Sequence, residues 1–206
     1  MSLQNRTTPQ GIIDVTSARG TLMGNRGVLH NSKKEVRHLF KSKAWITCLL
    51  EFKDRRRELM SPGLYTELFF LDEVTAFAAG HRPCAECRRA RFNEFRDAWG
   101  YANNQDGDSA VRAPQMDNVL HAERVDGDQK VTWRHSLADL PHGTMFQVGS
   151  DSYAVCDQNL LKWSFEGYSA VERRDLPETV DVLTPPSVVN IFNSGFKPVF
   201  HPTVTS

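Results

Sequence analysis

The sequence predicts an α+β fold built from two modules. In the first half, short apolar stretches rich in aromatic and β-branched residues are followed by segments of helical periodicity. In the second half, residues 131–170 hold short apolar stretches between turns, which is typical of a small antiparallel sheet or barrel. The chain has 206 residues, of which 40% are hydrophobic and 24% charged. This composition excludes collagen-like, disordered and disulfide-scaffold proteins.

The first module is expected to begin after an N-terminal arm at residues 1–19. Residues 20–31 contain three glycines and predict a turn-rich segment. Apolar residues at helical spacing predict a helix over residues 32–42. Residues 44–52 and 64–71 predict the two strands of a hairpin with a charged tip.

Two helices follow the hairpin. Asp72 is a favourable N-cap for the first helix, and Gly80 stands where a left-handed C-cap residue would end it. The second helix is predicted from Glu86 to Trp99, and Gly100 is expected to end it.

A polar, glycine-containing stretch then separates the two modules. A helix is expected near residues 114–125, followed by the strands of the second module, and a last helix from Ser187 to Asn193. The predicted organisation is an arm at 1–19, a metal-binding module at 20–100, a linker at 101–110 and a β-rich module at 111–206.

The strongest chemical motif is the pair Cys84 and Cys87, separated by two residues. Two thiolates at this spacing can bind one tetrahedral zinc ion at about 2.3 Å each. Cys87 stands at the start of the predicted second helix, where the helix dipole favours a thiolate. A redox role is the alternative, but the surrounding elements do not predict the βαβ setting of a thioredoxin-like site.

Residues 64–88 resemble the second half of the zinc-binding domain of Ada-type DNA alkylation-repair proteins. The resemblance rests on Phe69-Phe70, on the segment Asp72 to Gly80, and on His81-Arg82-Pro83-Cys84 with Cys87. It implies one bound zinc ion. In that family two further cysteine ligands form a CxxxC about 30 residues upstream, and one of them accepts the methyl group. This chain has Lys53 to Arg57 at that distance, so methyl-phosphotriester repair is not expected.

The other two zinc ligands would therefore come from elsewhere in the chain. Cys48 and His30 are the candidates. Cys48 lies on a predicted strand, and its alternative role is that of an ordinary buried cysteine. His30 lies in the glycine-rich turn segment, and its alternative role is that of a surface histidine.

Positive charge is concentrated in the first half of the chain. Residues 1–96 carry 17 Lys and Arg against 10 Asp and Glu, a formal charge of +7, whereas residues 97–206 carry the opposite charge of −7. Such a surface favours DNA or RNA, although a solvated face or a face that docks on the acidic half would carry the same charges. The predicted contact residues are Arg55, Arg56, Arg57, Arg88 and Arg89.

One polar group in the second half suggests catalysis. Asp117, His121 and Arg124 share one face of a predicted helix, and a carboxylate beside an imidazole can prepare it as a general base. The alternative is an ordinary helical ion network. These residues are the candidate catalytic groups if the protein is an enzyme, which the sequence leaves undecided.

The leading hypothesis is a zinc-containing, nucleic-acid-associated protein with a structural metal site. The first alternative is an enzyme that acts on a small polar or nucleotide-like substrate in a cleft between the modules. The second is a protein-interaction module that zinc staples together. No apolar stretch is long enough to span a membrane, and the N-terminal residues lack a secretory signal pattern, so we expect a cytoplasmic protein.

Overall fold

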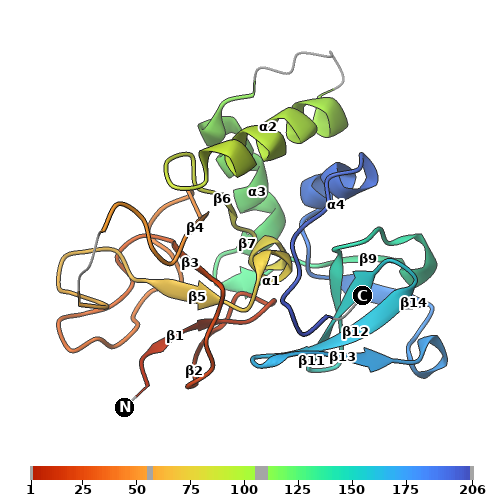
Figure 1. Cartoon of the computed structure of the whole chain (residues 1–206), viewed down its shortest axis with the longest axis horizontal. Helices are drawn as coiled ribbons and strands as arrows, with labels where there is room; N and C mark the ends of the chain where they lie inside the picture. The colour runs from red at the N-terminus through yellow and green to blue at the C-terminus, as the bar shows by residue number, and fades with distance from the viewer. Residues whose placement is uncertain (1, 55–57, 105–110, 205–206) are drawn as a thin grey trace.

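The computed structural model describes residues 2–54, 58–104 and 111–204. Two six-stranded sheets lie on either side of a short central helix, and three further helices gather at one end of both sheets (Figure 1). The α+β prediction is confirmed. No helix of the described residues is long and apolar enough to cross a membrane.

The first sheet has the strand order β2-β1-β5-β3-β4-β6. One of its faces carries Leu22, Leu68 and Phe70, which are buried in a common core with the central helix. Its opposite face carries the residues of the candidate site described below. The strands are β1 (Gln4–Thr7), β2 (Ile13–Val15), β3 (Leu22–Asn25), β4 (Ile46–Cys48), β5 (Leu68–Phe70) and β6 (Arg82–Pro83).

The second sheet has the strand order β13-β12-β11-β10-β14-β9 and is antiparallel throughout. A separate small hairpin precedes it, and two short 3-10 helices, η1 (Leu137–Asp139) and η2 (Arg173–Asp175), interrupt its connections. The strands are β7 (Val125–Asp126), β8 (Gln129–Lys130), β9 (Trp133–Ser136), β10 (Met145–Val148), β11 (Asp151–Cys156), β12 (Asn159–Ser164), β13 (Gly167–Val171) and β14 (Thr179–Val182).

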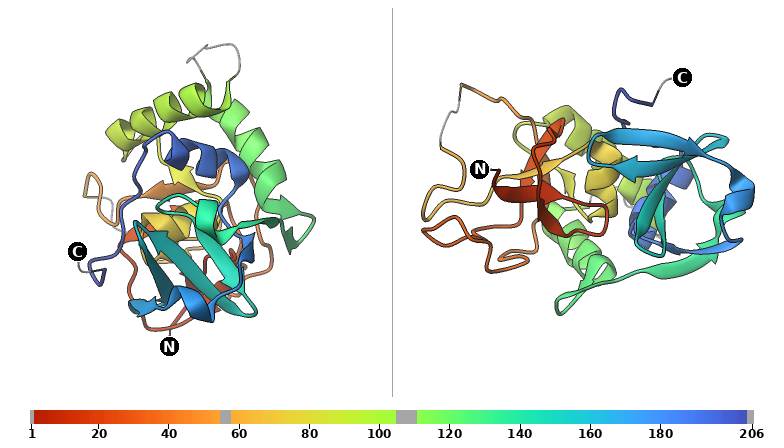
Figure 2. Two further views of the ribbon diagram at one scale, coloured as in Figure 1. Left: turned by 90° about the vertical axis from the view of Figure 1, so that its right-hand side faces the viewer. Right: turned by 90° about the horizontal axis from the view of Figure 1, so that it is seen from below.

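The helices join the two halves of the chain. They are α1 (Glu73–Ala78), α2 (Arg89–Asn103), α3 (Ala113–Arg124) and α4 (Pro186–Asn193). Every residue of α1 is buried, and the view from below shows it between the two sheets (Figure 2).

One aromatic core contains residues from all four helices. Phe77 of α1 stacks on Phe95 of α2 with ring centroids 5.4 Å apart, and it also meets Phe192 of α4 edge-on. Met116 and Leu120 of α3 complete the same buried cluster. The boundary predicted at 101–110 therefore does not separate two independent cores, because helices before and after it pack into one.

The caps of α1 lie where the sequence predicts them. Asp72 Oδ1 accepts hydrogen bonds from Thr75 N at 2.8 Å and from Thr75 Oγ1 at 2.7 Å, which satisfies an otherwise free amide of the first turn. Gly80 has φ +81°, and its backbone N–H donates to Phe77 O at 2.8 Å. A glycine is needed here because other residues rarely adopt this left-handed conformation.

Four predictions in the first half are corrected. Residues 44–52 and 64–71 form no hairpin, because their strands β4 and β5 each pair with β3 and not with one another. Residues 32–42 form no helix, since Asn31 Oδ1 accepts from Lys33 N and Glu35 N, and Lys34 takes φ +62° to close a loop. Helix α2 does not end at Gly100 but continues to Asn103, with Gly100 buried inside it. The N-terminal arm is part of the first sheet, as strands β1 and β2.

Candidate metal centre

Main-chain pairing brings the segment of Cys48 to the segment of Cys84. Strands β4 and β6 are parallel neighbours, with Ile46 opposite Arg82 and Thr47 opposite Pro83. The ladder continues beyond β6, because Cys84 N donates to Thr47 O at 2.8 Å. The sheet itself therefore places cysteines from two distant parts of the sequence side by side.

The sulfur atoms of Cys48, Cys84 and Cys87 lie within 4.8 Å of one another. Cys48 and Cys84 are buried, and Cys87 is partly exposed. Glu86 N donates a hydrogen bond to Cys84 Sγ at 3.4 Å. Among the described residues, no fourth His, Cys, Asp or Glu joins this group.

This arrangement fits a zinc ion. Tetrahedral zinc with bonds of about 2.3 Å to sulfur separates its sulfur ligands by about 3.8 Å. The present separations lie within 4.8 Å, so a small inward shift of side chains suffices to form three bonds. Three thiols can therefore hold one metal ion here, and a fourth coordination position is left for a ligand from another source.

The three thiols differ in their pKa values. A hydrogen bond from Cys48 lowers the pKa of Cys84 to about 5, against the opposing effect of burial. The same hydrogen bond, together with burial, raises the pKa of Cys48. The pKa of Cys87 is also raised, mainly by burial. Cys84 therefore loses its proton most readily of the three, and binding a dication would favour deprotonation of the whole group.

A cavity of about 1000 Å³ borders the cysteine cluster. Its floor is the outer face of the first sheet, where Met23 of β3 pairs with Cys48 of β4 and with Phe69 of β5. The next row pairs Asn25 with Ile46, and the same register continued by one residue places the buried Glu67 beside Asn25. The sequence analysis did not predict this floor. The signal that could have identified it is the alternation within each strand, which sets these side chains on one face.

Leucines and a tyrosine form much of the cavity rim. Leu49, Leu50, Leu59 and Tyr65 line the cavity, and each is more than a third exposed. A ligand in this cavity would therefore meet thiols at one wall, polar groups on part of the floor, and apolar side chains at the entrance.

His30 does not join the cysteines. Its Nδ1 contacts Thr66 Oγ1 at 2.6 Å, and its Nε2 contacts Ser61 O at 3.2 Å. The ring is buried, and both nitrogens contact the segment before β5. In this structure His30 stabilises loop geometry, and it is absent from the donor group at the cluster.

The arginine next to the cluster has internal partners. Arg88 donates through Nη1 to Thr47 Oγ1 at 2.6 Å and through Nη2 to Glu73 Oε1 at 2.5 Å. Arg91 contacts the second oxygen of Glu73 at 2.6 Å. Burial alone would raise the pKa of Glu73, but the two arginines outweigh it and hold that pKa below its ordinary value.

These contacts reduce the predicted nucleic-acid face. Arg88 is occupied by Thr47 and Glu73, which leaves it unavailable to a phosphate group in this conformation. Arg89 is exposed. Arg55, Arg56 and Arg57 lie outside the described residues.

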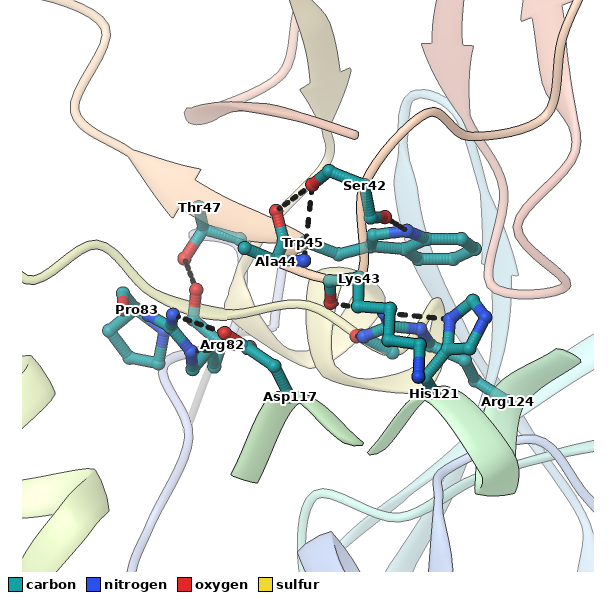
Figure 3. A network of polar contacts seen from close by, with 11 residues as sticks. Ser42, Lys43, Ala44, Trp45, Thr47, Arg82, Pro83, Asp117, His121 and Arg124 are labelled. Atoms are coloured by element: carbon teal, nitrogen blue, oxygen red, sulfur yellow. Dashed lines mark hydrogen bonds and ion pairs between the residues drawn. The ribbon is translucent and has the colours of Figure 1, made fainter. Parts of the chain in front are cut away.

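The group Asp117, His121 and Arg124 does not form a catalytic arrangement. Asp117 makes a buried two-pronged ion pair with Arg82, with both N–O distances at 2.8 Å, instead of contacting His121 (Figure 3). Arg124 donates to Gly80 O at 2.7 Å and to Lys43 O at 2.6 Å. Burial and then the positive charge of Arg124 lower the pKa of His121, which is the opposite of what an Asp–His pair would produce.

Comparisons with known proteins give no relative from which a function could be inferred. No family model, no curated protein and no solved structure matches this chain.

Proposed function

We propose that this protein binds one zinc ion through Cys48, Cys84 and Cys87, with the fourth coordination position directed at the adjacent cavity. The observation that carries the proposal is the meeting of three thiols, from two segments, at the wall of a cavity of about 1000 Å³. In zinc proteins, three protein ligands with an open position are typical of sites that bind a further ligand.

The third thiol favours metal binding over a redox role. A dithiol–disulfide couple needs only two cysteines, and Cys84 with Cys87 would suffice. Cys48 adds a thiol at the same point, which a two-electron couple does not use but a thiolate metal site requires. Thiolates select zinc over magnesium and calcium, which prefer oxygen ligands.

The residues of the cavity would position whatever takes the fourth place. Zinc bound here supplies a Lewis-acid position for one donor atom of a ligand. Met23 and Phe69 offer an apolar floor next to the cysteines. Asn25 and Glu67, whose Oε2 accepts a hydrogen bond from Met60 N at 2.9 Å, form a polar row further away. We expect a small ligand with a metal-binding atom at one end, an apolar body and a polar group at the other end.

The metal itself is tested by measuring the zinc content of protein purified without added metal. We expect Cys48→Ala, Cys84→Ser and Cys87→Ser each to lose the zinc that the unaltered protein carries at this site. The matched control His30→Gln should keep it, because His30 is outside the cluster. Retention of full zinc content by the cysteine variants would overturn the proposal.

The open fourth position is tested with cobalt-substituted protein. Imidazole is the probe, because it is a neutral donor small enough to enter the cavity. Its addition should shift the visible absorption of bound cobalt if the fourth position is exchangeable. An unchanged spectrum at high imidazole concentration would show that a fourth protein ligand closes the site, and the proposal would then reduce to a structural ion.

Association with nucleic acid is a second proposal. Its basis is the charge of +7 over residues 1–96. Several arginines of this segment are hydrogen-bonded inside the fold: Arg26 and Arg82 are buried, and Arg88 is half-buried. If a nucleic-acid face exists, affinity for DNA or RNA should fall steeply with salt. Absence of binding in an electrophoretic mobility assay at low salt would remove this proposal.

A further inference from the structure

A second group of metal-ligating side chains lies on the other sheet. His142 is in the loop before β10, Cys156 is the last residue of β11, and Asp157 follows it in the turn to β12. One donor atom from each lies within 4.8 Å of the other two. This group shares no residue and no strand with the three-cysteine cluster.

The imidazole is directed at the turn. His142 Nδ1 accepts a hydrogen bond from Asp157 N at 3.0 Å, and it lies 3.1 Å from Asp157 Oδ1. Because Nδ1 accepts, its lone pair faces the space that also holds the carboxylate. A metal ion that replaced this hydrogen bond would therefore meet nitrogen and oxygen donors already turned toward it.

The three ligands are carried by rigid backbone. Gly143 N donates to Val155 O at 2.8 Å, and Val155 N donates to Thr144 O at 2.9 Å, so the loop that bears His142 is bonded to β11. The aromatic ring of Phe200 packs edge-on against the imidazole, with centroids 5.2 Å apart. Donors held in this way lose little freedom when an ion binds.

The donor set identifies the class of ion. A thiolate, an imidazole and a carboxylate are the three ligand types of zinc sites, and a thiolate disfavours magnesium and calcium. The Asp157 side chain is 69% exposed, so an ion can enter from solvent without opening the fold. Three protein donors leave room for water in a tetrahedral site.

We propose that His142, Cys156 and Asp157 form a second zinc site, independent of the three-cysteine cluster and weaker because it is solvent-exposed. Zinc bound there would join the loop before β10 to the β11–β12 turn.

The test is a zinc titration of metal-free protein against a chromophoric chelator. The unaltered protein should bind two equivalents, whereas Cys156→Ser and His142→Gln should each bind one. Asp157→Asn should weaken the second equivalent by about tenfold or more, since it removes a charged ligand. The matched control Asp151→Asn, on the same strand but outside the group, should bind two equivalents with unchanged affinity.

The same titration separates this proposal from the one above. Cys84→Ser should bind one equivalent, and Cys84→Ser combined with Cys156→Ser should bind none. Two results would overturn the second site and leave the first intact. One is a second zinc equivalent that remains in both Cys156→Ser and His142→Gln. The other is a single zinc equivalent in the unaltered protein that Cys84→Ser abolishes. If Cys156→Ser lost a zinc equivalent while Cys84→Ser bound as much zinc as the unaltered protein, the first site would be overturned and the second would stand.

Discussion

Arg88 Nη1 donates a hydrogen bond to Thr47 Oγ1 at 2.6 Å, and each of these residues is the immediate sequence neighbour of a cysteine in the cluster. Arg88 follows Cys87, and Thr47 precedes Cys48. The contact therefore ties the segment carrying the CxxC to strand β4 at the point where the proposed ligands meet. It acts on the metal site by positioning the cysteines.

Loss of this contact should weaken zinc binding. Thr47→Val removes the hydroxyl but keeps the shape of the side chain, and we expect zinc affinity to fall about tenfold, the lower end of what outer-shell partners contribute. Stability should fall by about 1–2 kcal/mol, because the hydroxyl also donates to Arg82 O at 3.4 Å and both hydrogen bonds are lost. Chelator competition measures the first quantity and urea unfolding the second. Unchanged affinity in Thr47→Val would show that the contact does not position the site.

Arg88→Ala should cost more stability than Thr47→Val. It removes one of two cations from Glu73, whose side chain is only 2% exposed, so we expect a loss of about 3 kcal/mol in the free energy of unfolding. Arg88→Lys should recover part of that loss, since it restores the charge without the second prong. Equal unfolding midpoints for Arg88→Ala and the unaltered protein would contradict this assignment.

Asp117→Asn should destabilise the fold strongly. It leaves the buried guanidinium of Arg82 without its carboxylate, which typically costs about 3–5 kcal/mol. The control is Asp97→Asn, whose carboxylate is exposed and pairs with the half-buried Arg96, and which should change stability by about 0.5 kcal/mol or less. Urea unfolding of both variants gives the comparison. Similar losses in the free energy of unfolding would show that the Asp117–Arg82 pair stabilises the fold no more than the Asp97–Arg96 pair does.

Gly80→Ala should be poorly tolerated. An added Cβ would lie 2.4 Å from Cδ of Arg124, whose guanidinium is fixed by its hydrogen bond to Gly80 O. We expect a loss of about 2–4 kcal/mol from backbone strain and overpacking together. Gly149→Ala is the matched control, since Gly149 also has positive φ but nothing within 4 Å, and it should lose only about 1 kcal/mol. Thermal unfolding distinguishes the two, and equal losses would show that the contact with Arg124 is unimportant.

Stability should rise with pH above neutrality because of Lys130. Burial, and then the positive charges of Arg26 and Arg124, together lower the pKa of Lys130 from 10.5 to about 7. Between these two values the unfolded chain keeps a proton that the folded chain has released, so the free energy of unfolding increases by up to about 1.4 kcal/mol per pH unit.

The variant Lys130→Met isolates that effect. Urea unfolding at several pH values from 7 to 10 should give a smaller rise for Lys130→Met than for the unaltered protein. Other groups that titrate in this range are common to both proteins and cancel in the difference. Parallel curves for the two would mean that Lys130 is not the group responsible.

Local signals were sufficient to predict the elements nearest the cluster. Asp72 and Gly80 define α1 because N-cap and C-cap chemistry depends on a few neighbouring residues. Cys48 was a candidate ligand because a complete zinc site needs further ligands from upstream of the CxxC. Its approach to Cys84 depends on parallel pairing of β4 and β6, which no local pattern specifies.

The sequence could not reveal which charges are internal. The i, i+4 spacing of Asp117 and His121 predicted a pair on one helix face, but Arg82, 35 residues away, takes the carboxylate in a buried geometry that is energetically stronger. Arg88 was predicted to contact nucleic acid because positive charge is concentrated in the first half of the chain. Its partner Thr47 lies 41 residues away, so only the folded chain shows that the guanidinium is occupied.

The pairing of β4 with β6 has a consequence for how the protein would acquire its ion. Main-chain hydrogen bonds, including the one from Cys84 N to Thr47 O, gather the thiols before any metal arrives. Many small zinc domains are unfolded without their ion, because the ion alone holds their ligands together. Here the pairing of β4 with β6 holds the cysteines together, so zinc could leave and return while the fold persists.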